Sequence, residues 1–173
     1  MKQVADRIRW TVDLLEAAPS DLILEIGCGT GAAVSLICGR LRDGMVTAVD
    51  QSKKMILAAR KKNAEHESAG KVRFVAAKFH EADLGESRFH KVFAINVNVF
   101  WQNPARELHP IRERLLPGGT LYLVNQPPAL GKIRVIEERT THHLTAAGFD
   151  IRQIVVGEQK PVPALRVIAR CLP

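Results

Sequence analysis

Three glycines at alternate positions follow a short apolar run near the start of the chain. The run at positions 22–26 contains Glu25, and Gly27, Gly29 and Gly31 come directly after it. Glycine permits a positive φ and lets another molecule approach the backbone closely. A helix that begins after such a turn directs its unpaired N–H groups toward the crevice above the strand. The spacing therefore predicts a strand, a tight turn and a helix that together bind a nucleotide.

A carboxylate, Asp50, follows the next apolar run at positions 45–49. In a β-α-β unit this position lies at the carboxyl end of the second strand, where a carboxylate can accept hydrogen bonds from both ribose hydroxyls. The alternative is that Asp50 or Ser52 caps the helix expected over residues 52–66. We favour the ribose role for Asp50.

Apolar periodicity predicts the elements that must position these residues. Strands are expected at residues 22–26, 45–49, 72–76, 91–95, 120–124, 149–156 and 165–171. Helices are expected before the first strand, after the glycine turn, at residues 52–66, from residue 103 and from residue 131. The link at residues 157–163 is too short for a crossover helix, so the last two strands should form an antiparallel hairpin. The chain is therefore predicted to be an α/β protein with a seven-stranded, doubly wound sheet and helices on both faces.

Composition indicates one folded unit. The chain has 173 residues, of which 46% are hydrophobic and 25% are charged, so we expect a single domain over residues 1–173, with residues 1–18 as an N-terminal helix. No run is long enough for a membrane span and no signal peptide is recognisable, so we expect a cytoplasmic protein without membrane contact. Cys28, Cys38 and Cys171 have neither zinc-site nor disulfide spacing.

The net charge of +7 raises the question of a nucleic-acid partner. The densest basic group lies on the expected helix at residues 52–66 and has no aromatic residues between its members, as base stacking would need. A solvated helix face is the favoured interpretation, and nucleic acid stays open as a less favoured partner.

Glu25 and the third glycine distinguish two readings of the turn. Gly27, Gly29 and Ala32 also fit the dinucleotide pattern G-x-G-x-x-G/A. Glu25 and Gly31, however, give E-x-G-x-G-x-G, which resembles motif I of the class I S-adenosylmethionine-dependent methyltransferases. The L-x-P-G-G turn at residues 115–119, before an apolar strand, resembles the same family at a second place. The resemblance covers nearly the whole chain and implies the strand order 3-2-1-4-5-7-6, with strand 7 antiparallel.

The resemblance implies S-adenosyl-L-methionine as the cofactor, with its methionine part on the glycine turn and its ribose on Asp50. Lys78 stands where the family usually has an acidic residue that accepts a hydrogen bond from the adenine amino group. A lysine cannot accept, so adenine recognition must come from the backbone at residues 77–79, from Phe79, or from packing against Gln51. The expected cofactor-binding residues are Glu25, Gly27, Cys28, Gly29, Gly31, Asp50, Gln51, Lys78, Phe79 and Asn96.

The segment after the fourth strand is the expected acceptor site, because this strand end adjoins the glycine turn in that sheet order. Asn96, Asn98 and Trp101 are expected to form one wall and Trp10 the other. The alternative is that Trp101 and Phe100 only cover the core. The segment lacks the N-P-P-Y sequence of amino-group methylating enzymes, and the similar Asn125–Pro128 follows the wrong strand.

No catalytic residue is assigned. Transfer of a methyl group from a sulfonium is an in-line displacement that depends mostly on positioning. His80, His90 and the pair His142–His143 are available as general bases, and none is singled out. No carboxylate cluster suggests a metal.

The expected function is transfer of a methyl group by in-line displacement to a small-molecule acceptor. A non-catalytic S-adenosylmethionine-binding subunit, a methyltransferase acting on RNA or protein, and a nucleotide-dependent oxidoreductase are the alternatives. The sequence leaves a homodimer open.

Overall fold

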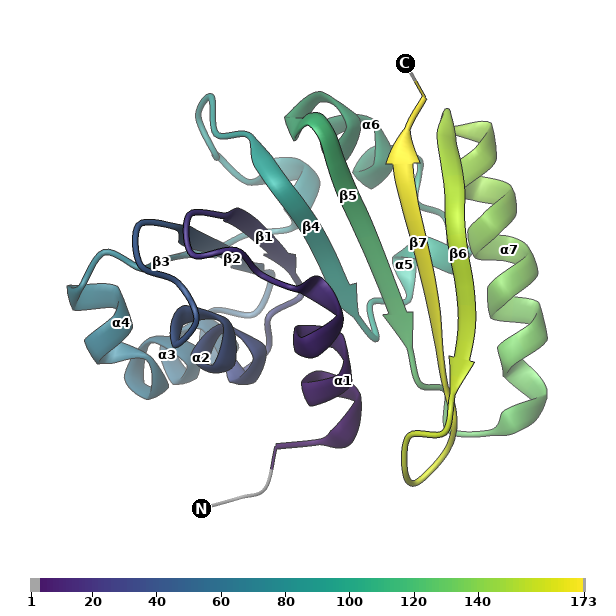
Figure 1. Cartoon of the computed structure of the whole chain (residues 1–173), viewed down its shortest axis with the longest axis horizontal. Coiled ribbons are helices and arrows are strands. Elements are labelled where there is room, and N and C mark those ends of the chain that lie inside the picture. The colour runs from purple at the N-terminus through teal and green to yellow at the C-terminus, as the bar shows by residue number, and fades with distance from the viewer. Residues whose placement is uncertain (1–3, 173) are drawn as a thin grey trace.

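The computed structural model describes residues 4–172, and its centre is one seven-stranded sheet (Figure 1). The strand order is β3-β2-β1-β4-β5-β7-β6, which confirms the order expected from the sequence. Neighbouring strands from β3 to β5 are parallel, whereas β7 runs antiparallel to both β5 and β6. The strands are β1 (Leu22–Ile26), β2 (Met45–Asp50), β3 (Val72–Ala76), β4 (Phe89–Ile95), β5 (Leu115–Asn125), β6 (Phe149–Gly157) and β7 (Ala164–Cys171).

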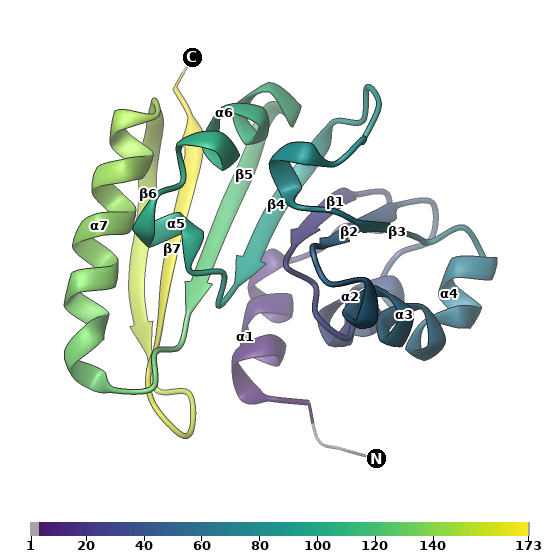
Figure 2. The same ribbon diagram turned by 180° about the vertical axis from the view of Figure 1, so that it is seen from behind.

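Helices cover both faces of the sheet (Figures 1 and 2). The helices are α1 (Asp6–Leu15), α2 (Ala32–Cys38), α3 (Lys53–Lys62), α4 (Ala64–Ser68), α5 (Val99–Gln102), α6 (Ala105–Arg114) and α7 (Ile133–Ala146), with short 3-10 turns η1 (Phe79–Glu81) and η2 (Leu130–Lys132). Buried side chains of α1, α2 and α3 pack on one face, and those of α5, α6 and α7 pack on the other. The doubly wound arrangement expected from the sequence is therefore confirmed.

The apolar runs form strands because both faces of the central sheet are buried. Along β4, Val92 and Ala94 belong to one core cluster, and Phe93, which lies between them, belongs to the other. Successive side chains of a strand point to opposite faces, so a strand covered on both sides must be apolar throughout.

Two helices differ from their expected bounds. The N-terminal helix is shorter than residues 1–18 and spans Asp6–Leu15, while residues 1–3 of the expected helix lie outside the described residues. The helix expected over residues 52–66 is divided at Asn63 into α3 and α4. The buried Asn63 amide donates to the carbonyl of Ala59 at 2.9 Å, and such a side-chain bond competes with the helical backbone pattern.

No helix in the described part of the chain combines the length and the apolar character needed to cross a membrane.

Candidate functional site

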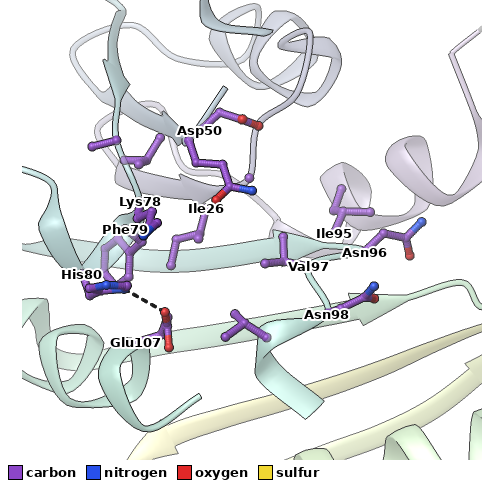
Figure 3. A pocket seen from close by; sticks show the side chains of 15 residues that line it. Ile26, Asp50, Lys78, Phe79, His80, Ile95, Asn96, Val97, Asn98 and Glu107 are labelled. Carbon is purple, nitrogen blue, oxygen red and sulfur yellow. Dashed lines mark hydrogen bonds and ion pairs between the residues drawn. The ribbon is translucent and has the colours of Figure 1, made fainter. Parts of the chain in front are cut away.

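A cavity of about 660 Å³ opens at the carboxyl ends of β1, β2, β3 and β4 (Figure 3). This volume lies within the range of about 300 to 1,000 Å³ that is typical of small-molecule sites. In an open α/β sheet the carboxyl ends of the strands are the usual place for a ligand. The lining residues are Ile26, Gly27, Val49, Asp50, Gln51, Ala77, Lys78, Phe79, His80, Ile95, Asn96, Val97, Asn98, Val99 and Glu107.

Asp50 lines this cavity and is held in place by two backbone groups. One carboxylate oxygen accepts from the N–H of Ser52 at 2.9 Å, and the other accepts from the N–H of Gly29 at 2.9 Å. Ser52, whose hydroxyl accepts from the N–H of Met55 at 3.3 Å, is the N-cap of α3. The alternative in which Asp50 itself caps the helix is therefore wrong. Each carboxylate oxygen keeps a lone pair for a further donor.

The three glycines of the turn have different surroundings, although all have positive φ values of 75°, 52° and 71°. A Cβ at Gly31 would lie 2.6 Å from the Asn63 amide nitrogen, so Gly31 is required for packing against α3. A Cβ at Gly29 would meet no atom of the described chain within 4 Å. Gly27 lines the cavity and lies against the side chain of Val97. The turn therefore packs at Gly31 and leaves open space at Gly29.

Asn63 holds the turn on α3, and reasoning from the sequence missed it. Its side chain is 1% exposed, donates to the carbonyl of Gly31 at 3.2 Å and accepts from the hydroxyl of Ser35 at 2.7 Å. The signal was present, because Ile56, Ala59 and Asn63 have the spacing of one helix face. An asparagine on a buried stripe needs hydrogen-bond partners.

Glu25 lies in β1 and is 3% exposed, so it is buried beneath the turn and does not line the cavity. Burial, and secondarily the charge of Asp50, raises the pKa of its carboxyl to about 8. Its Oε2 atom has no hydrogen-bond partner within residues 4–172. Glu25 therefore holds a proton at neutral pH. Burial likewise raises the pKa of the neighbouring Cys28 thiol, which disfavours a reactive thiolate.

The floor of the cavity carries an acid and a histidine from different elements. His80 of η1 and Glu107 of α6 pair through Nδ1 and Oε1 at 3.0 Å (Figure 3). Glu107 is 8% exposed and its Oε2 atom has no partner among the described residues. Lys78, above them, has an exposed side chain 3.5 Å from Glu81. Sequence reasoning considered His80 only as a base and missed Glu107, whose signal was its place beside the inward-facing Leu108 and Ile111.

Two asparagines expected near the acceptor line the cavity. Asn96 adopts a positive φ of 57°, and its side-chain oxygen accepts from the N–H of Gln126 at 2.7 Å. Gln126 in turn accepts from the guanidinium of Arg7 at 3.1 Å, which connects α1 to this end of the sheet. Asn98 accepts from the indole N–H of Trp101 at 3.3 Å.

The two tryptophans lie outside the lining of this cavity. Trp101 packs against the core cluster that includes Phe100, which is 1% exposed, so Trp101 meets the cavity through its bond to Asn98. Trp10 lies beneath the guanidinium of Arg166, whose carbon atom is 5.2 Å from the ring centroid. A Cβ at Gly157 would lie 2.7 Å from Trp10, which places this ring on the β6–β7 hairpin.

The structure thus divides the expected site residues into two groups. Those that line the cavity are Gly27, Asp50, Gln51, Lys78, Phe79, Asn96 and Asn98, and those that do not are Glu25, Cys28, Gly29, Gly31, Trp101 and Trp10. Among the other histidines, His90 accepts from the N–H of Leu22 at 3.0 Å, and His142 and His143 pack edge to face on α7. Residues 4–172 bring together no group of three or more His, Cys, Asp or Glu side chains that could hold a metal ion.

Comparisons with known proteins agree with this geometry. A family model described as a methyltransferase domain matches residues 23–119. The O-methyltransferase cnsE of Penicillium expansum is 30% identical over 123 residues, which cover 70% of this chain and 44% of the fungal protein. The uncharacterized methyltransferase YdaC of Bacillus subtilis (strain 168) is 27% identical over 158 residues, 88% of this chain and 84% of the relative. The chain therefore spans less than half of the fungal relative and most of the bacterial one.

The fold has close counterparts among solved structures. A SAM-dependent methyltransferase from Aquifex aeolicus superimposes with a TM-score of 0.79 at 16% sequence identity, over 97% of this chain and 90% of the other.

Proposed function

Because this chain belongs to the family of methyltransferase domains and is an S-adenosyl-L-methionine-dependent enzyme, we propose that it methylates a hydroxyl group of a small organic molecule. The observation that carries the proposal is the cavity of about 660 Å³, which places Asp50 at one side and two asparagine side chains at another. A relative that is itself named an O-methyltransferase supports oxygen as the methylated atom.

The residues present fit this cofactor. Asp50 keeps acceptor capacity on both carboxylate oxygens for the ribose hydroxyls. The open space at Gly29 admits a ligand close to the backbone, and Glu25 adds a buried carboxyl beneath the turn with one unpartnered oxygen. When bound, the cofactor supplies a methyl group that its positively charged sulfur makes electrophilic.

Asn96 and Asn98 orient the acceptor in this proposal. They follow β4, which lies next to β1, so both residues line the cavity beside the glycine turn, where the side-chain oxygen of Asn96 also accepts from the N–H of Gln126. An amide side chain both donates and accepts, and can therefore align a hydroxyl oxygen. Holding two reactants in line supplies a large part of the acceleration of a displacement, so the proposal assigns the chain a positioning role and names no general base.

The test is transfer of an isotope-labelled methyl group from the cofactor. The purified chain is incubated with a panel of small phenols and hydroxy acids, with total RNA, and with protein. The expected result is labelled small molecule, and its absence in the Asp50→Ala variant. Label that enters only RNA or only protein would overturn the proposal. Cofactor binding without transfer to any of the three classes would favour the non-catalytic alternative.

Two accompanying proposals follow from the sequence. The partner is the small acceptor rather than nucleic acid, and the reaction takes place in the cytoplasm. Sedimentation of the purified chain, with and without RNA, tests the first proposal and also measures whether the chain forms the homodimer that the sequence leaves open.

A further inference from the structure

Glu107 is a buried acid on the cavity wall with unused hydrogen-bonding capacity. It is 8% exposed, one oxygen pairs with His80 Nδ1 at 3.0 Å, and the other has no partner among the residues that the structure describes. Leaving a buried polar atom without a partner is unfavourable. A buried acceptor of this kind calls for a donor from a ligand or from water.

The position of Glu107 relates it to one part of the cofactor. In Figure 3, Asp50 and Glu107 lie at opposite ends of the cavity, with Ile26, Phe79 and Val97 between them. If Asp50 holds the ribose, the attached base occupies this apolar middle. The far edge of the base then faces Glu107. Adenine is flat and largely apolar on its faces, and its exocyclic amino group is its N–H donor.

From this arrangement we infer that Glu107 accepts a hydrogen bond from the adenine amino group and selects adenine over bases that lack it. The inference deepens the proposed function and rests on the same cofactor. Lys78, at the end of β3, cannot serve, because an ammonium group only donates. Its side chain is also directed to Glu81, at 3.5 Å.

His80 holds the carboxylate of Glu107 in position. The bond between Nδ1 and Oε1 fixes one oxygen of Glu107, so the carboxylate cannot turn freely away from the cavity. The terminal torsion of a glutamate has a broad minimum, so a small rotation brings Oε2 toward an arriving amino group. Glu107 therefore recognises the base and His80 acts through it.

The inference is tested by the binding of two ligands, measured by titration calorimetry. The probes are S-adenosyl-L-homocysteine and its 6-deamino analogue, in which a hydrogen atom replaces the amino group. Because a hydrogen bond to a charged group is among the stronger ones, the unmodified chain should prefer the amino ligand by about 10- to 100-fold.

Glu107→Leu should lower this preference to about one, chiefly by weakening the amino ligand, because leucine fills a similar volume without an acceptor. Glu107→Gln retains one neutral acceptor and should give an intermediate preference, which keeps the test available if the leucine variant does not fold. The control is Glu113→Leu on the same helix, because the Glu113 side chain is 65% exposed and does not line the cavity.

A Glu107→Leu variant that keeps the full preference would overturn the inference, as would an unmodified chain that binds both ligands equally. Selective binding without methyl transfer to small hydroxylated molecules would instead count against the proposed function alone. A chain that binds neither ligand would contradict both this inference and the proposed function.

Discussion

Replacing Glu25 with glutamine should change how stability depends on pH. Glu25 is 3% exposed, and its burial, with a smaller effect of Asp50, raises the carboxyl pKa from 4.5 to about 8. A group whose folded-state pKa is raised contributes stability that is fully present below the unfolded pKa. That contribution is lost as the pH rises through the folded pKa. The free protein should therefore become less stable between about pH 5 and pH 8.

The magnitude follows from the number of protons. Between these two pKa values the folded chain holds about one proton more than the unfolded chain at this position. The free energy of unfolding then falls by about 1.4 kcal/mol per pH unit. Between pH 6 and pH 8 the loss is about 2 kcal/mol, because Glu25 begins to ionise in the folded state near the upper limit. Glutamine has no proton to lose, so Glu25→Gln lacks this contribution.

Urea unfolding of both chains at pH 6 and pH 8, in the absence of cofactor, measures the difference. The advantage of Glu25→Gln over the unmodified chain should grow by about 2 kcal/mol between the two pH values. The exposed Glu86, replaced in the same way, should give no such growth. A pH-independent difference between Glu25→Gln and the unmodified chain would refute the argument that burial keeps this carboxyl protonated.

Four further substitutions test the site. Asp50→Ala should weaken cofactor binding by about 1.5 to 3 kcal/mol in calorimetry, the contribution of hydrogen bonds to a charged group, and unchanged affinity would contradict the ribose role. Gly31→Ala should lower the free energy of unfolding by about 2 to 4 kcal/mol, because Gly31 has a positive φ and the added Cβ would collide with Asn63. Gly29→Ala should lower it by only about 1 to 2 kcal/mol, because Gly29 also has a positive φ but no described atom lies within 4 Å of the added Cβ. Trp101→Phe should raise the KM of the acceptor several-fold and leave cofactor affinity within about twofold. The aromatic ring keeps its packing in this variant, whereas the hydrogen bond from the indole N–H to Asn98 is lost. An unchanged KM would show that this hydrogen bond does not position the acceptor.

The central sheet could be predicted because its causes are local. Each feature that predicts the strands and turns lies within a few neighbouring residues: the apolar runs, the glycines and the short link before the last strand. The order of the strands came from the family resemblance. The positions of Asp50 and Asn98 followed from that order, since Asp50 is the last residue of β2 and Asn98 follows β4.

What could not be predicted depends on contacts between distant parts of the chain. The Trp10 ring lies on the β6–β7 hairpin because Gly157 leaves room for it and Arg166 lies over it. The residues around Trp10 in the sequence predict neither contact. The burial of Asn63 likewise depends on its bond to the distant carbonyl of Gly31. Glu107 was not recognised because an acidic residue beside an apolar helix stripe is usually exposed. It is buried here because η1 places His80 against it, and the sequence does not show where η1 lies.

The cavity draws on only part of the sheet. Its lining residues in the described chain all come from the stretch Ile26–Glu107, while β5, β6, β7 and α7 contribute none of them. The strands that line the cavity and those that complete the sheet are thus separate parts of the chain, and the bond from the Gln126 N–H to Asn96 joins them. Changes on the exposed face of α7 that leave this bond in place should therefore not alter the cavity lining. A protein engineer would accordingly vary exposed positions of α7, such as Arg134 and Glu138, and keep the first four strands and Gln126 fixed.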